Sequence, residues 1–223
     1  GLDNEDAPGV YDALPFLIAN TKQIMGFGET ADEPYVSMEG KRVVVLGGGD
    51  TAMDCVRTSI RQNAAHVICA YRRDEENMPG SKREVKNARE EGVEFQNLCN
   101  PVEILGDENG RVNGLKCIRM ELGEPDESGR RRPVAIPDSE FVLDVDTVIM
   151  AIGTSPNPLI SGTTKGLDTN RWGCLVVNEE MATTKDKVYA GGDAVTGAAT
   201  VILAMGAGKT AAVSIDEVLR GKA

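Results

Sequence analysis

Several features that mark other classes of protein are scarce or missing in this sequence of 223 residues. It has no run of about 18 apolar residues of the kind that crosses a membrane. Its five cysteines include no Cys-x-x-Cys pair, and His66 is its single histidine. These absences argue against a membrane-spanning helix, a disulfide framework, a metal site and dithiol redox chemistry.

Basic residues are also in short supply. Lys and Arg number 24 against 35 Asp and Glu, for a formal net charge of −11. An acidic chain is not attracted to nucleic acid or to anionic lipid, so any anion it binds needs a local site. The N-terminus lacks the charged segment and apolar stretch of a secretory signal. We therefore expect a soluble, cytoplasmic protein with no nucleic-acid or membrane partner.

Aromatic residues make up only 4% of the chain, whereas glycine occurs 25 times. This balance favours an α/β fold built on Val, Ile, Ala and tight turns. The length allows one large domain, or one complete domain and part of a second. We expect the latter.

The pattern of apolar residues predicts strands and helices in alternation after residue 40. Residues 42–46 form a short apolar run bounded by glycines, typical of a strand buried on both faces. Helical spacing follows through Ala52, Val56 and Ile60. Further expected elements are strands at 67–71, 93–98, 145–152 and 188–190, and helices at 82–91 and 200–219.

Three local expectations complete the pattern. Residues 1–39 indicate a connector with one helix. Ser81 and Glu84 have the spacing of a capping box at the start of the 82–91 helix, and Gly92 is suited to its end. Alternating side chains over residues 102–143 predict an antiparallel insertion.

The first candidate site is the segment Gly47-Gly48-Gly49-Asp50-Thr51-Ala52, a match to Gly-x-Gly-x-x-Ala between a strand and a helix. The first glycine permits the turn, the second lets the backbone approach a pyrophosphate, and the small last residue allows close packing. The amides of the helix N-terminus then favour an anion. A purely structural turn is the alternative, but the context favours dinucleotide binding.

Two arginines, Arg72 and Arg73, follow the second strand of this unit. An NAD-binding unit usually has an acidic residue here, about 20 residues after the glycines, to hold the ribose hydroxyl. Guanidinium groups instead suit the 2′-phosphate of NADPH. The alternative is a solvated basic pair balanced by Asp74, Glu75 and Glu76.

The second candidate site is Gly191-Gly192-Asp193, at the end of the strand expected at 188–190. A carboxylate in such a position can bind a ribose or ribityl hydroxyl. Gly-Gly-Asp is also an ordinary turn, and the sequence alone does not decide between the two.

Long segments of this chain resemble the small subunits of bacterial glutamate synthase, within the flavoproteins that have two dinucleotide-binding domains. The matching segments are Val43 to Ala52, Cys69 to Glu75, Met78 to Ser81, Asn87 to Val93, Gly129 to Pro133, Ala151 to Gly153 and Ala190 to Val195. Residues 154–223 look more like an archaeal and clostridial branch that includes NADPH-linked ferredoxin oxidoreductases.

The resemblance implies a Rossmann-like NADPH domain with a mainly parallel sheet, inserted into an FAD domain. Residues 40–150 would be the NADPH domain, and 1–39 and 151–223 would be parts of the FAD domain. The residues it implies at the cofactors are Gly47, Gly48, Gly49, Asp50 and Thr51 at the pyrophosphate, Arg72 and Arg73 at the 2′-phosphate, Ala151 and Gly153 at the return, and Gly192 and Asp193 near the flavin.

The function implied is transfer of electrons from NADPH through FAD toward glutamate formation from glutamine and 2-oxoglutarate. The partner would be a glutamate synthase large subunit or another electron-accepting protein. Only one Gly-x-Gly-x-x-Ala segment lies between an expected strand and an expected helix, and the family's cysteine clusters for iron–sulfur centres are missing. We therefore expect a piece of a longer protein that is inactive by itself and holds no FAD, with no general acid or base to assign.

Two other functions remain open at this stage. A related flavoprotein could deliver electrons to ferredoxin or a different acceptor. Alternatively, the chain could be a non-catalytic NADPH-binding module. A thioredoxin reductase is disfavoured because its nucleotide domain would need a Cys-x-x-Cys pair.

Overall fold

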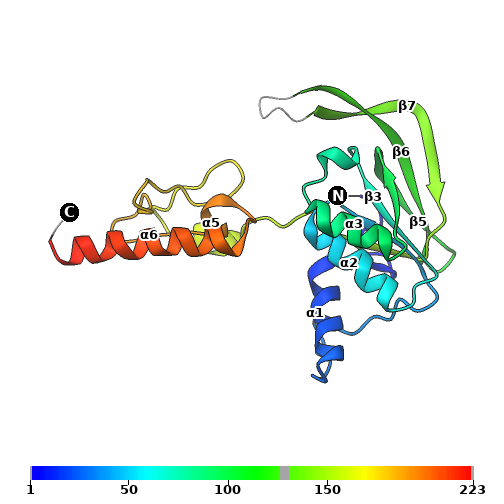
Figure 1. The fold of residues 1–223 in the computed structure, drawn as a ribbon, viewed down its shortest axis with the longest axis horizontal. Helices are drawn as coiled ribbons and strands as arrows, with labels where there is room; N and C mark the ends of the chain where they lie inside the picture. Colours follow the sequence, from blue (N-terminus) through cyan, green and yellow to red (C-terminus); the bar gives the residue numbers. More distant parts are fainter. Residues whose placement is uncertain (1, 126–130, 222–223) are drawn as a thin grey trace. The chain divides into compact units, whose positions relative to one another are not determined.

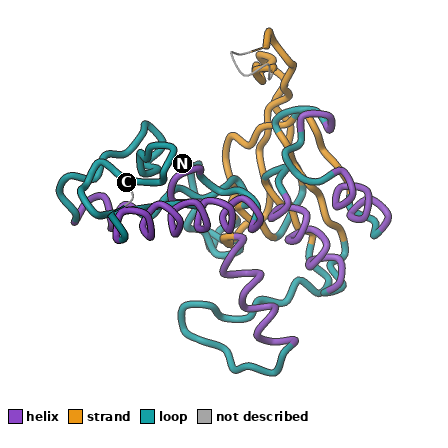
Figure 2. The backbone as a smooth tube through the Cα atoms, turned by 60° about the vertical axis from the view of Figure 1, so that its left-hand side comes forward, coloured by secondary structure: helices purple, strands orange, loops and turns teal. Residues whose placement is uncertain are grey.

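The computed structural model describes residues 2–125 and 131–221 of the chain. It separates into two compact units, Gly1–Gly153 and Thr154–Ala223, which are described in turn. Figures 1 and 2 show the helices, strands and loops of each unit. No helix within the described residues is long and apolar enough to span a membrane.

A five-stranded parallel sheet forms the centre of the first unit, with the strand order β1-β8-β2-β3-β4. The strands are β1 (Val10–Asp12), β8 (Thr147–Met150), β2 (Arg42–Leu46), β3 (His66–Tyr71) and β4 (Glu94–Asn97). The apolar run expected at 42–46 is thus the central strand, and its residues 43–46 are buried. Its burial on both faces explains why it lacks alternation.

Helices cover one face of this sheet. They are α1 (Ala13–Ile24), α2 (Asp50–Arg61) and α3 (Lys82–Glu90), with the short 3-10 helix η1 (Glu75–Asn77) before α3. Val43 and Val45 point into the core that these helices share with the sheet. The expected helix–strand alternation after residue 40 is confirmed in this part of the chain.

A second sheet covers the opposite face. It is three-stranded and antiparallel, with the order β5 (Cys99–Gly106), β6 (Val112–Pro125) and β7 (Arg131–Leu143). Val44 and Leu46 of β2 share a core with Ile104 and Leu115 of this sheet. The unit therefore has three layers, and the expected antiparallel insertion is confirmed as one of them (Figure 1).

Residues 1–39 do more than the expected connector with one helix. Val10–Asp12 form a strand whose residue Val10 pairs with Val148 of β8. Phe16 of α1 is buried in the core beside α2. A strand of three residues is too short to leave a periodic signal, so the sequence predicted the helix and not the strand.

The expected capping box before α3 does not form. Ser81 makes no side-chain cap hydrogen bond. Glu84 instead pairs with Arg57 of α2, which also binds Glu91. An ion pair between two helices has taken the side chain that the local motif needed. The end of α3 is as expected, because Gly92 adopts the left-handed region at φ +99°.

The second unit has helices α4 (Pro158–Thr163), α5 (Asp193–Thr196) and α6 (Val201–Leu219). The helix expected at 200–219 is confirmed as α6, with Thr200 as its N-cap. The strand expected at 188–190 is wrong, because Tyr189 makes only an isolated bridge with Ala182. One bridge is not a ladder, and a strand needs successive pairs with a neighbour.

An ion pair fastens the first residue of β2 to the segment before β8. The Arg42 guanidinium pairs with Asp144 and donates to both oxygens of Asp146, with an Nε–Oδ2 distance of 3.1 Å. The Arg42 amide also donates to Asp146. These hydrogen bonds hold the pKa of the Asp146 carboxyl below its usual range.

We expect Asp146→Asn to cost about 1 kcal/mol of stability or less at pH 7, since the pair is partly exposed. A lowered folded-state pKa means that the contribution is present above about pH 4, the unfolded value, and is lost as pH falls through the folded pKa. Urea unfolding at pH 7 and pH 3 should show the variant and parent converging in acid. A difference that persists or grows at pH 3 would contradict this assignment.

Candidate functional site

The glycine-rich loop begins where β2 meets its two neighbours. Gly47 has φ +136°, and a Cβ placed there would lie 2.2 Å from the carbonyl oxygen of Ala151, just after β8. The Gly47 amide donates to the Ala70 carbonyl of β3 over 3.0 Å. Only glycine fits this position. The structure thus brings Ala151 beside Gly47, as expected for residues at adjacent strand ends.

Gly48 packs on an aromatic ring that the sequence did not single out. A Cβ on Gly48 would lie 2.7 Å from a ring carbon of Tyr71, the last residue of β3. The Gly48 carbonyl accepts the Gly80 amide at 2.9 Å. Gly48 therefore contacts Tyr71 on one side and Gly80 on the other. Packing within the protein is enough to require glycine here, whether or not a ligand binds.

Gly49 is different, because nothing in the protein lies near the position of its absent Cβ. It is the N-cap of α2, with φ −87°, and provides no side-chain cap for the first turn. The amides of that turn have no partner within the helix. Open space beside Gly49 and the uncapped amides of the next turn fit the approach of an anionic group such as a pyrophosphate.

Asp50 and Thr51 form the first turn of α2 and are exposed. Asp50 is the one acidic residue of that turn. Its Oδ1 accepts the Ser81 amide at 2.7 Å, so the carboxylate has a partner within the protein.

The two arginines lie beyond the carboxyl end of β3, beside β2 in the sheet. Arg72 is exposed, and its side chain forms no hydrogen bond or ion pair with any residue that the structure describes. Arg73 is partly buried, and its Nε donates to the Arg131 carbonyl at 3.1 Å. Arg72 thus has its full guanidinium available, whereas Arg73 is partly committed to β7.

Two of the three neighbouring acids, Asp74 and Glu75, have partners other than these arginines. Asp74 accepts the Asn77 amide at 3.0 Å and caps η1. Glu75 pairs with Arg89 of α3 at 2.5 Å. This arrangement favours an outside anion as the partner of Arg72.

The remaining expected residues lie at the end of the first unit and in the second. Gly153 has φ +104° and ends the first unit. Gly192 is buried with φ +69°, and a Cβ there would lie 3.2 Å from the Cβ of Ala204 in α6. Gly192 is therefore suited to close packing on α6, whatever ligand the unit binds.

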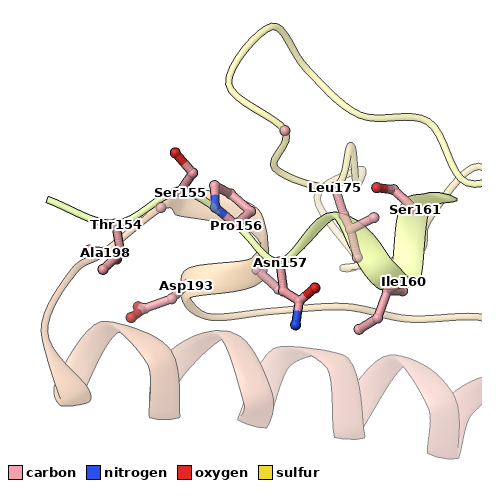
Figure 3. Close-up of a pocket in the computed structure, with 12 residues that line it drawn as sticks. Thr154, Ser155, Pro156, Asn157, Ile160, Ser161, Leu175, Asp193 and Ala198 are labelled. Atoms are coloured by element: carbon pink, nitrogen blue, oxygen red, sulfur yellow. The ribbon is translucent and has the colours of Figure 1, made fainter. Parts of the chain in front are cut away.

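Asp193 follows Gly192 and is exposed at the start of α5. Its Oδ1 accepts the Ala199 amide at 3.3 Å. It also lines a cavity of about 270 Å³ within the second unit. Figure 3 shows this cavity, whose lining includes Thr154, Asn157, Ile160, Ser161, Leu175 and Asp193.

The cysteines behave as small buried apolar residues. All five are buried free thiols. Burial raises the pKa of Cys55 and of Cys69 to about 12, which keeps both protonated at neutral pH. Neither thiol is suited to nucleophilic chemistry.

Residues 7–212 match the family model described as pyridine nucleotide-disulphide oxidoreductase. The chain belongs to this family. Membership agrees with the α/β fold, the glycine-rich loop and the resemblance to flavoproteins seen in the sequence.

Two curated relatives show which members of the family this chain resembles in sequence. The chain is 58% identical to the glutamate synthase [NADPH] small chain of Escherichia coli K12, over 96% of this chain and 46% of that protein. It is 55% identical to the putative oxidoreductase AegA of the same organism, over 96% of this chain and 33% of that protein. The chain therefore spans less than half the length of these two relatives.

Among solved structures, FprA from Mycobacterium tuberculosis in complex with NADPH has a similar fold. The TM-score is 0.72 at 17% identity, covering 100% of this chain and 61% of that one. At this identity the likeness supports the fold alone.

Alanine substitutions at Gly47 and Gly49 are expected to have different effects on stability and binding. Gly47→Ala should destabilise the fold by about 3 kcal/mol or more, because it adds strain and a backbone collision. Gly49→Ala should cost less than about 1 kcal/mol of stability at this N-cap position. Its methyl group should nevertheless weaken NADPH binding about tenfold or more, since it occupies the open space beside Gly49 that the nucleotide is proposed to use.

Urea unfolding and calorimetric titration of both variants test this pair. A stable Gly47→Ala protein would contradict the packing described for β2 and β8. Unchanged affinity in Gly49→Ala would contradict the placement of a ligand over α2.

Proposed function

We propose that residues 40–150 bind NADPH and that the parent protein is a flavin-dependent oxidoreductase of the glutamate synthase small-chain type. The observation that carries this proposal is the pairing of open, uncapped amides at Gly49 with an unpartnered Arg72 at the end of the adjacent strand. The first suits a pyrophosphate and the second a 2′-phosphate.

The carboxyl end of a parallel sheet is where open α/β folds bind ligands. β2 and β3 both end there, and their following segments hold Gly49 and Arg72 respectively. A dinucleotide lying across these two ends would meet the amides of α2 with its pyrophosphate and Arg72 with its ribose phosphate. A bound nicotinamide would supply hydride to a flavin, and the described residues would bind and orient the nucleotide.

The 58% identical relative is named as an NADPH glutamate synthase small chain. We extend that role to the parent of this chain: electrons from NADPH pass through FAD toward formation of glutamate from glutamine and 2-oxoglutarate. The partner proposed is a glutamate synthase large subunit. A cytoplasmic location is part of the same proposal.

A second candidate is an oxidoreductase that gives its electrons to a different acceptor, such as ferredoxin. The 55% identity to the putative oxidoreductase AegA favours keeping it. Both candidates share the NADPH site and differ in the partner protein. Pull-down of the parent protein with a glutamate synthase large subunit would favour the first, and reduction of another acceptor without that subunit would favour the second.

For the flavin we propose that Asp193 lies on the FAD side of the parent protein, with Gly192, and that residues 151–223 belong to the FAD domain. Residues 1–39 supply β1 and α1 to the first unit. Asp193 is exposed beside the cavity of the second unit, which supports a role in binding hydroxyl groups. In the first unit, β1 runs into α1 at Asp12–Ala13 without a glycine-rich turn. β1 and α1 therefore offer no second pyrophosphate loop like that of β2 and α2.

We expect the purified 223-residue chain to be colourless, because its described residues form one glycine-rich strand-to-helix turn and that turn is assigned to NADPH. The visible absorption spectrum after purification and after incubation with FAD tests this expectation. A chain that retained one flavin per molecule would contradict it.

We expect the chain to prefer NADPH over NADH and Arg72→Ala to weaken NADPH binding about 10- to 100-fold with NADH binding unchanged. Arg73→Ala should have a smaller effect, because Arg73 is partly committed to Arg131. In the double variant the preference for NADPH should vanish. Calorimetric titration with both nucleotides measures all of these.

Arg111→Ala is the matched control. Arg111 is exposed, and its charge acts on Lys41 and Asp146, which precede β2 and β8 at the amino ends of these strands. The proposed site lies at the carboxyl ends. It should bind both nucleotides like the parent. Binding of neither nucleotide by the parent chain would overturn the proposed function. Equal binding of both would overturn the role of the arginines alone.

A further inference from the structure

The turn between β3 and α3 lies directly on the glycine-rich loop. Tyr71, at the end of β3, packs its ring against Gly48 and donates its hydroxyl to the Asn77 carbonyl at 2.9 Å. One side chain therefore touches the loop and, at the same time, holds the middle of the 74–81 turn at Asn77.

Two adjacent amides at the other end of this turn complete the attachment. The Gly80 amide donates to the Gly48 carbonyl at 2.9 Å, and the Ser81 amide donates to Asp50 Oδ1 at 2.7 Å. A Cβ on Gly80 would lie 2.9 Å from the Gly48 carbonyl oxygen, so the approach requires glycine. The bond to Asp50 is charge-assisted and is the stronger of the two.

Asp50 supplies the hydrogen-bond acceptor for the N-cap amide of α3 that a capping box would supply locally. In a capping box, the N-cap amide of a helix is satisfied by the acidic residue three positions on. Before α3 that residue is Glu84, which pairs with Arg57 instead. Asp50, 31 residues from Ser81 and on a different helix, accepts the N-cap amide in its place. The first turn of α2 and the start of α3 are thereby joined.

We propose that Asp50 is a positioning residue: through the Ser81 amide it locks the 74–81 turn over Gly48 and so fixes the glycine-rich loop in the shape that a pyrophosphate needs. The inference rests on the proposed function and assigns Asp50 a different part in it. The carboxylate does not contact the phosphates, which it would repel. It is held by Ser81, and the amides that follow Gly49 bind the anion.

Substitutions at Ser81 that remove or keep its backbone amide test whether the bond to Asp50 is what holds the turn. Ser81→Pro removes the amide donor, and φ −57° at Ser81 is already suited to proline. Ser81→Ala keeps the amide, and the Ser81 side chain makes no cap bond, so it is the matched control. Asp50→Ala removes the acceptor, whereas Asp50→Asn retains an oxygen that can accept.

We expect Asp50→Ala and Ser81→Pro to weaken NADPH and NADH binding equally, by about tenfold or more, the usual scale for a hydrogen bond to a charged group. The ratio of the two affinities should stay at the parent value, because both nucleotides share the pyrophosphate. Ser81→Ala should bind like the parent, and Asp50→Asn should restore most of the affinity. Combining Asp50→Ala with Ser81→Pro should add little to either alone.

Hydrogen exchange followed by NMR on the chain without nucleotide gives the second measurement. The Gly80 amide, bonded to Gly48, should exchange about tenfold faster or more in Asp50→Ala, since releasing Ser81 frees the turn. A purely structural Asp50 would instead lower the melting temperature and leave affinity unchanged.

Two outcomes would overturn the inference: unchanged nucleotide affinity in a folded Asp50→Ala protein, or equal loss of affinity in Ser81→Ala and Ser81→Pro. Unchanged exchange at Gly80 would do the same. A parent chain that bound neither nucleotide would sink the proposed function instead, and the exchange of Gly80 would still decide whether Asp50 locks the turn.

Discussion

The close approach of β2 and β8 at their carboxyl ends is the constraint on which the rest of the site depends. Gly47 has no room for a side chain, because the Ala151 carbonyl occupies the position that a Cβ would take. β8 comes 100 residues and one complete antiparallel sheet after β2 in the chain order, yet it must return beside β2 in register. The second sheet must therefore place the chain beside β2 again at the start of β8. The core that this sheet shares with Val44 and Leu46 fixes that position.

Local charge explains how an acidic chain can present an anion site. Several acids of η1 and α3 are paired with cations on the helices: Glu75 with Arg89, and Glu84 and Glu91 with Arg57. The pKa of Glu91 is held below its usual range by hydrogen bonds from Arg61 and Arg57. These pairs offset part of the negative charge, and the amides of α2 and the guanidinium of Arg72 add local positive potential, so net charge does not forbid phosphate binding.

Elements with a strong local pattern could be predicted from the sequence, and contacts between distant residues could not. The run at 42–46, the helices α2, α3 and α6 and the antiparallel insertion followed from periodicity. β1 was missed because three residues carry no period, and the strand expected at 188–190 failed because it has no neighbour to form a ladder with. At the site, the glycines and arginines were visible as motifs, whereas the packing of Tyr71 on Gly48 depends on tertiary structure.

The two units differ in how much hydrophobic core each forms from its own residues. This difference bears on whether each proposed cofactor site can form in its unit alone. The first unit encloses two hydrophobic cores made from its own residues. In the described part of the second unit, Cys174 is the buried hydrophobic residue, and α6 leaves Val201, Ile202 and Leu203 exposed. The residues proposed to bind NADPH all lie in the first unit, where packing on both faces of the sheet fixes the strands that carry them. NADPH binding should therefore depend on the first unit alone, whereas the flavin assignment depends on a unit whose apolar helix is still largely uncovered.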